Sequence, residues 1–133
     1  MQFDLVTPEK LLVSDSATYV SIPGSEGSFG VLEMHQPTLS TFNPGKVVVE
    51  NGDKVKEYFV SFGFADVTGE KVTILTEESV LKAEINVDET TAELAEANAR
   101  LAQLMKSSAP EADVEVATKK VQVLEAKLNV ARA

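Results

Sequence analysis

The sequence predicts a two-part chain: an N-terminal antiparallel β-sandwich or flattened barrel of about ten strands, followed by a C-terminal antiparallel two-helix hairpin. All six Phe and both Tyr residues precede residue 65, and all seven glycines precede residue 70. Eleven of the 14 alanines follow residue 86, where no glycine or aromatic residue occurs. Aromatic and β-branched residues favour strands, whereas a glycine-free, alanine-rich segment favours helix. We therefore expect domains at 1–85 and 86–133.

Short alternating or β-branched runs, each ended by turn residues, predict the strands. These runs span 3–7, 10–13, 17–22, 38–42, 46–50, 55–60, 64–67, 72–75 and 79–82. In the clearest hairpin, Asn51-Gly52 supplies the positive φ angles of a tight turn. Connections this short leave no room for parallel crossovers of a dozen or more residues, which favours an antiparallel arrangement. We interpret 24–30 as a loop whose three glycines adopt positive φ between strands.

Two segments carry helix signals. The first, 87–106, follows Asn86, and Glu89 lies three residues beyond it, which is the spacing of a capping box. The second follows Pro110. In both, apolar residues recur at alternating spacings of three and four, which predicts a packed seam. The seam residues are Leu94, Ala97, Leu101 and Leu104, then Val114, Ala117, Val121, Leu124, Leu128 and Ala131.

A loop of a few residues makes the two helices antiparallel neighbours. Small seam residues bury little area, so the pairing contributes only a few kcal/mol at ~25 cal/mol/Å². Conformational entropy opposes it by a similar amount. We expect a hairpin of marginal stability that is able to undock or extend.

Composition excludes several classes of protein. The net charge is −9, with −7 in residues 1–86 and −2 in the rest, which disfavours nucleic acid as a partner. There is no cysteine, and so no disulfide framework or thiolate nucleophile. The first residues show no signal-peptide pattern, and no run approaches the ~18 apolar residues of a membrane span. We expect a soluble, cytoplasmic protein that reaches a membrane only through a protein partner.

Catalytic and metal-binding patterns are weak. His35 is the single histidine, and we expect it to cap a turn or lie at an interface. The acidic pairs Glu77-Glu78 and Asp88-Glu89 are adjacent in sequence, so their side chains diverge in a strand or helix. Residues 24–30 are glycine-rich but lack the Gly-x-Gly-x-x-Gly order and the Gly-Lys-Ser/Thr ending of phosphate loops. We expect no catalytic residue, no metal and no cofactor.

The stretch Gly24-Ser25-Glu26-Gly27, with Gly30, His35, Pro37 and Leu39, resembles the signature of the epsilon subunit of bacterial F-type ATP synthase. The resemblance continues through Phe42-Asn43-Pro44-Gly45, residues 59–67 and residues 72–75, and so covers nearly all of the first part. The family also has this domain order. The residues of this sequence that match the turn positions of the signature are Gly24, Gly27, Gly30, Pro37, Pro44 and Gly45.

The resemblance implies a non-catalytic rotor subunit in the central stalk, coupling proton transport to ATP synthesis. Its sandwich would bind the gamma subunit and rest on the c-ring, at the cytoplasmic face of the bacterial inner membrane. The hairpin would extend toward the alpha/beta head and restrain ATP hydrolysis, which suits a marginal two-state element. Residues placed toward rotor partners by resemblance are Ser28, Glu33, Met34, His35 and Gln36.

One motif departs from the family pattern. Some relatives bind ATP through Ile/Leu-Asp-x-x-Arg-Ala at the start of the first helix. Here Ile85 matches, but Asn86 replaces the Asp and Glu89 replaces the Arg. A carboxylate facing a triphosphate repels it, so we expect weak or absent ATP binding.

Two alternatives stay open from sequence. One is a standalone β-sandwich binding module with a helical oligomerisation tail, which would show exposed aromatic residues on a concave face. The other is a small enzyme that uses His35 with a nearby carboxylate. Association with ATP synthase subunits distinguishes the rotor subunit from both.

Overall fold

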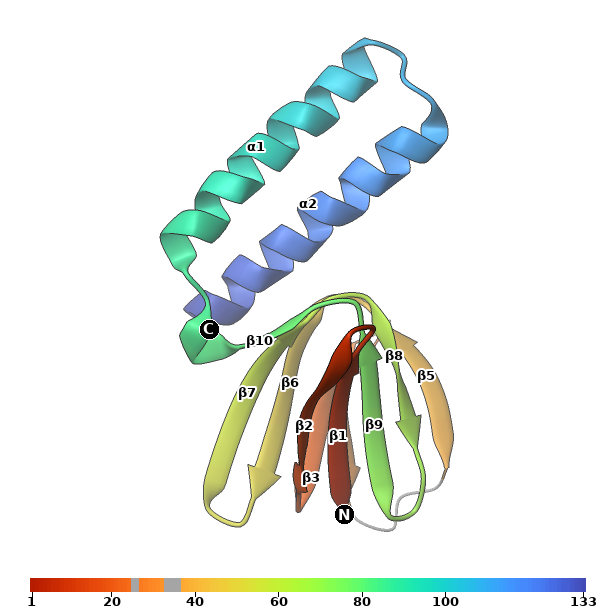
Figure 1. Cartoon of the computed structure of the whole chain (residues 1–133), viewed down its shortest axis with the longest axis vertical. Coiled ribbons are helices and arrows are strands. Elements are labelled where there is room, and N and C mark those ends of the chain that lie inside the picture. Colours follow the sequence, from red (N-terminus) through yellow and green to blue (C-terminus); the bar gives the residue numbers. More distant parts are fainter. Residues whose placement is uncertain (25–26, 33–36) are drawn as a thin grey trace. The chain divides into compact units, whose positions relative to one another are not determined.

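A computed structural model of the chain describes residues 1–24, 27–32 and 37–133. It divides into two compact units, Met1–Lys82 and Ala83–Ala133. The first unit contains ten strands and the second contains two helices (Figure 1). The expected succession of a β-sandwich and a helical hairpin is confirmed.

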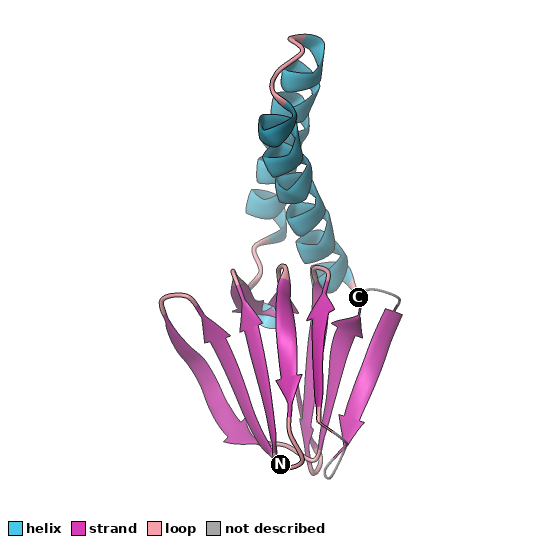
Figure 2. Cartoon of the chain, turned by 90° about the vertical axis from the view of Figure 1, so that its right-hand side faces the viewer, coloured by secondary structure: helices cyan, strands magenta, loops and turns pink. Residues whose placement is uncertain are grey.

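The strands form two five-stranded sheets, drawn in magenta in Figure 2. Sheet A has the order β2-β1-β9-β8-β5, and sheet B the order β10-β7-β6-β3-β4. The bounds in sheet A are Lys10–Ser16 (β2), Gln2–Thr7 (β1), Lys71–Thr76 (β9), Gly63–Val67 (β8) and Thr38–Phe42 (β5). Those in sheet B are Ser79–Leu81 (β10), Lys54–Val60 (β7), Gly45–Asn51 (β6), Tyr19–Gly24 (β3) and Gly27–Leu32 (β4).

One strand pair contradicts the expectation of a wholly antiparallel sandwich. β1 and β9 are parallel, with Gln2 opposite Lys71 and Val6 opposite Leu75. The connection between these strands is the whole chain from β2 to β8, which is far longer than a parallel crossover needs. The short turns between neighbouring strands therefore did not exclude a parallel pair of strands far apart in the sequence.

The loop expected over residues 24–30 is also wrong. β3 continues to Gly24, β4 begins at Gly27, and Gly30 lies opposite Ser21 in the ladder between these strands. Gly30 is therefore a strand residue and not a turn residue between strands. Glycine has little intrinsic strand preference, so the pairing with β3 is what makes this segment a strand.

The inner faces of the two sheets form the sandwich core. Strand residues alternate between buried and partly exposed, as in β1, where Phe3 and Leu5 are buried. The Phe3 ring stacks on Tyr58 from the other sheet with 6.4 Å between ring centroids. The remaining core strand residues are Val20, Ile22, Phe42, Val47, Val49, Val60, Ala65, Val67, Val72 and Ile74.

The helices are α1, Val87–Lys106, and α2, Glu111–Arg132. Asn86 is the N-cap of α1, as predicted, and its Oδ1 accepts the Glu89 amide at 2.9 Å. Buried residues of the seam come from both helices, which confirms this part of the predicted pattern. They are Ala97, Val121, Leu124 and Leu128, and Leu94 and Leu101 pack against the first three. Neither helix has the length and apolarity needed to cross a membrane, within the residues that the structure describes.

Candidate docking surface

The outer face of sheet A exposes large apolar side chains. Leu11, Leu39 and Phe64 are 53%, 72% and 41% exposed, whereas Leu12 beside Leu11 packs against the core and Ala65 beside Phe64 is buried. Among the side chains described in the sandwich, one other large apolar residue is exposed, Val55 on sheet B. Contiguous exposed apolar surface marks a site of interaction in a soluble domain. This face is therefore the strongest candidate for a functional surface.

The strand register aligns these side chains. Val6 lies opposite Leu11 on β2 and opposite Leu75 on β9, and Leu75 lies opposite Phe64 on β8. These four residues form an apolar row across four strands of sheet A. Directly opposed residues on one face have β-carbons about 5 Å apart, so the row is continuous.

A groove of about 530 Å³ lies beside the apolar row, and Val6, Phe64 and Leu75 are among the residues that line it. Its volume falls in the range of sites that hold a ligand or a partner's side chains, roughly 300–1,000 Å³. The groove joins the apolar row to the β1–β2 turn and to the start of β8. Its lining residues are Val6, Thr7, Pro8, Phe62, Gly63, Phe64, Leu75, Thr76 and Glu77.

Gly63 allows the two strands behind the groove to approach closely. A β-carbon at this position would collide with the Leu75 carbonyl oxygen and lie 2.9 Å from the Thr76 α-carbon. Any larger residue would therefore push β8 away from β9.

A buried polar cluster fixes the corner behind the groove, where β7 leads into β8 and β9 into β10. Ser61 and Thr76 are 3% and 5% exposed, and their hydroxyl oxygens lie 3.2 Å apart. Ser61 Oγ accepts the Glu78 amide at 2.9 Å. Thr76 Oγ1 lies 3.2 Å from the Phe62 carbonyl oxygen. Because buried polar groups are costly unless paired, this cluster holds both corners in one conformation.

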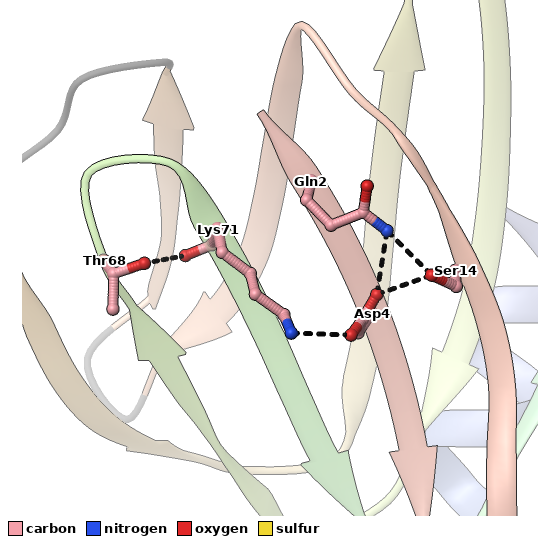
Figure 3. A network of polar contacts seen from close by, with 5 residues as sticks. All are labelled: Gln2, Asp4, Ser14, Thr68 and Lys71. Atoms are coloured by element: carbon pink, nitrogen blue, oxygen red, sulfur yellow. Dashed lines mark hydrogen bonds and ion pairs between the residues drawn. The ribbon is translucent and has the colours of Figure 1, made fainter.

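A polar network borders the apolar row on β1, β2 and β9 (Figure 3). Asp4 accepts hydrogen bonds from Gln2 Nε2 at 3.1 Å and Ser14 Oγ at 2.9 Å, and Lys71 Nζ lies 3.0 Å from its second oxygen. The Gln2 hydrogen bond, then those of Lys71 and Ser14 and the Lys71 charge, hold the pKa of Asp4 below its ordinary value of 3.8 against desolvation. An apolar centre with a satisfied polar rim is typical of protein interfaces.

The residues predicted to face rotor partners are only partly described. Ser28 is the second residue of β4, whereas Glu33, Met34, His35 and Gln36 lie outside the described residues. Four strand steps separate Ser28 from Leu32, or about 13 Å at the usual rise. Ser28 therefore lies near the start of β4 and Leu32 at its end. The expected role of His35 stays a prediction.

The positions of the degenerate ATP motif lie at the start of α1. Asn86 uses its side-chain oxygen to cap the helix, and Glu89 is an exposed residue of the first turn. Ile85 precedes the cap and is half-buried. The residue that replaces the family Asp is thus engaged with the backbone of its own helix.

The other predicted turn residues lie at strand boundaries. Pro37 directly precedes β5, and Pro44 lies between the end of β5 and Gly45, the first residue of β6. Among the described residues, no group of three or more histidine, cysteine or acidic side chains lies close enough to hold a metal ion.

Sequence reasoning missed the apolar row. A signal was present, since Leu11-Leu12 and Leu75 place apolar residues at consecutive strand positions, where a half-exposed strand alternates. Which of them face outward depends on a bulge between Leu5 and Val6, and no local pattern revealed that bulge. The exposed face therefore became visible only with the strand register.

Comparisons with known proteins identify the fold. Residues 1–82 match the model of the ATP synthase delta/epsilon chain β-sandwich domain. An ATP synthase epsilon chain of Paramagnetospirillum magneticum is 45% identical over 77% of this chain and 74% of its own length. One from Jannaschia sp. is 38% identical over 90% of this chain and 86% of its own.

Solved structures agree. A chain in the Euglena gracilis mitochondrial ATP synthase (OSCP/F1/c-ring) superposes with a TM-score of 0.79 at 28% identity, over 98% of this chain and 80% of its own length. A chain in the Tetrahymena thermophila central stalk/c-ring structure has a TM-score of 0.54 at 16% identity, over 90% and 95%, and shows similarity of fold alone. The family model covers the sandwich and the epsilon-chain relatives extend over three quarters or more of the sequence, so this chain belongs to the ATP synthase epsilon chain family.

Proposed function

We propose that this chain docks onto the gamma subunit of an ATP synthase through the outer face of sheet A. An epsilon chain is a non-catalytic subunit of the rotor stalk, so what this protein does depends on the surfaces it presents. The observation that carries the proposal is the apolar row with its groove, which contains Leu11 and Phe64, two of the four large apolar side chains exposed in the described part of the sandwich. A protein partner would bury it and release its ordered water.

The remaining partner assignments follow the family. By resemblance, the position of Ser28 and the segment Glu33 to Gln36 would face the rotor partners, gamma and the c-ring. The chain would then sit at the cytoplasmic face of the bacterial inner membrane, held there by the complex. Ring rotation driven by protons would pass through this subunit and gamma to the catalytic head.

The hairpin would serve as a mobile regulatory arm. Four of its predicted seam residues are less than one-tenth exposed, and two partly buried leucines pack against three of them. A seam this small is consistent with an element that undocks and extends toward the alpha/beta head. Deleting residues 87–133 should then raise the ATP hydrolysis of the assembled enzyme, and unchanged hydrolysis would exclude the inhibitory role.

The start of α1 favours weak or absent ATP binding. Glu89 presents a carboxylate where the family motif has Arg, and the Asn86 side chain is occupied as a cap. Isothermal titration with Mg-ATP should show no binding in the micromolar range. A micromolar dissociation constant would contradict this part of the proposal.

The docking face is tested with a matched pair of substitutions. Phe64→Ser removes an aromatic anchor from the apolar row, whereas Val55→Ser removes an exposed side chain from sheet B. Both residues are exposed, so both variants should keep their fold, which is checked by their melting temperatures. Binding to the cognate gamma subunit should weaken at least ~10-fold for Phe64→Ser, as for a central interface anchor. Equal affinities of the two variants would exclude this face.

A further inference from the structure

The link between the two compact units is short and is fixed at both ends. β10 ends at Leu81 and α1 begins at Val87. The intervening residues include one 3₁₀ turn, Lys82–Glu84, whose hydrogen-bond geometry is weaker than that of an α-helix. Ala83 and Glu84 are exposed.

We propose that the ion pair between Glu57 and Lys82, called the pin below, anchors the start of the link to sheet B. It thereby confines the hinge of the hairpin to residues 83–85. The proposal deepens the regulatory role of the hairpin and rests on its proposed mobility. It assigns a positioning role to a carboxylate outside both the family motif and the docking face.

On the sandwich side, several contacts hold the chain up to Lys82. Ser79, Val80 and Leu81 pair with β7, and Ser79 Oγ donates a hydrogen bond to the Phe59 carbonyl at 2.8 Å. Beyond the last pair, Lys82 Nζ lies 3.4 Å from Glu57 Oε2. This ion pair ties Lys82, the residue after the last β10 pair, to β7.

Glu57 is itself held in place by a second cation. Lys46 Nζ on β6 lies 3.1 Å from Glu57 Oε1, so each carboxylate oxygen meets one lysine. The three side chains are 23–33% exposed, which leaves them less screened than fully exposed pairs. Lys46 therefore orients the carboxylate toward Lys82 at little further entropic cost.

On the hairpin side, the first turn of α1 is closed by its own contacts. The Asn86 carbonyl oxygen accepts both the Thr90 amide at 3.0 Å and the Thr90 hydroxyl at 2.7 Å. Thr90 is 2% exposed. With its side chain on the Glu89 amide, Asn86 belongs to the helix, so residues 83–85 keep the backbone freedom.

Hydrogen–deuterium exchange of the full chain tests the pin. In Glu57→Gln, the carboxylate charge is lost, the last β10 pairs fray, and amides of residues 80–85 should exchange about 2–5-fold faster. Asp4→Asn is the matched control, because it removes a carboxylate that meets Lys71 at 3.0 Å on sheet A. It should leave residues 80–85 unchanged.

The salt dependence of amide exchange is an independent test of the ion pair. Raising NaCl from about 50 to 500 mM should accelerate exchange at residues 80–85 in the wild type, because screening weakens the ion pair. The Glu57→Gln variant should not respond. Wild-type exchange rates in Glu57→Gln, or an equal effect of Asp4→Asn on this segment, would overturn the pin. Exchange is measured on the isolated chain, so its outcome is separate from gamma binding and from inhibition of hydrolysis.

Discussion

Removing one hydroxyl from the buried corner cluster tests how the two sheets are joined. Thr76→Val keeps the shape of the side chain and deletes Oγ1, which lies 3.2 Å from Ser61 Oγ and from the carbonyl oxygens of Phe62 and Glu78. Both carbonyls keep a backbone donor, Glu77 N–H for Phe62 and Ser61 N–H for Glu78. The variant should lose about 0.5–1.5 kcal/mol of unfolding free energy, the net worth of a satisfied hydrogen bond.

Ser61→Ala should cost more. It removes the contact with Thr76 and also the oxygen that accepts the Glu78 amide at 2.9 Å. Ser61 is 3% exposed, so water does not readily replace that acceptor. Taking away the acceptor of a buried amide costs about 1–3 kcal/mol. The structure therefore ranks Ser61→Ala as the more destabilising of the two changes.

Urea unfolding measures both variants. Both tyrosines belong to the sandwich and the chain has no tryptophan, so tyrosine fluorescence reports on that unit, while the helical circular dichroism signal reports mainly on the hairpin. The midpoint should fall at a constant m-value, which indicates lost stability and not a changed denatured state. The predicted order of stability depends on which backbone groups keep a hydrogen-bond partner in each variant. A Thr76→Val variant less stable than Ser61→Ala would refute it.

Three further substitutions test the packing and the charges. Gly63→Ala should destabilise the sandwich by about 1–3 kcal/mol or more, because its β-carbon meets the Leu75 carbonyl; an unchanged urea midpoint would contradict the collision. Leu124→Ala, 5% exposed in the seam, should cost about 2–5 kcal/mol and so abolish the helical signal of a marginal hairpin while tyrosine fluorescence persists; full retained helicity would show a more stable hairpin. The folded pKa of Asp4 is lowered, so its contribution to stability is present above the unfolded value near 3.8 and is lost as pH falls through the folded value. Asp4→Asn should therefore lessen the decline in stability on acidification below about pH 4, measured by urea unfolding at several pH values; an unaltered decline would contradict the shift.

Local signals predicted the local elements. Of the Asn51-Gly52 pair expected to turn the chain, Asn51 ends β6 and Gly52 follows in the β6–β7 turn with a φ of 65°, the positive angle that glycine supplies. The first helix starts at the predicted cap because Asn86 Oδ1 accepts the amide of Glu89, three residues later in the sequence. In both cases the residues that decide the structure are sequence neighbours.

Pairings over long distances were not predictable in this way. β4 holds glycines at positions 27 and 30, which are typical of a loop, and it becomes a strand by pairing with β3. Position 69 carries another glycine with open space around it, and there the turn signal and the structure agree. The difference between these glycines is whether a partner strand lies alongside.

The docking surface was predictable only in outline. The resemblance directed attention to Ser28 and the segment after β4, whereas the apolar row combines residues from four strands. Leu11 and Phe64 are separated by more than fifty positions in sequence and belong to one face only through the register of β1 and β9. An exposed face of this kind is a property of the sheet and not of any one segment.

The parallel pairing of β1 with β9 affects how the protein is made. β1 leaves the ribosome about 70 residues before β9, its neighbour in the centre of sheet A. Until β9 is made, the β1–β2 pair has an unpaired strand edge. Contacts between residues so distant in sequence slow folding, because a long loop must close before they form. We expect nascent chains shorter than residue 76 to remain open to proteases and chaperones. Completion of β9 would then be the step that closes sheet A during synthesis.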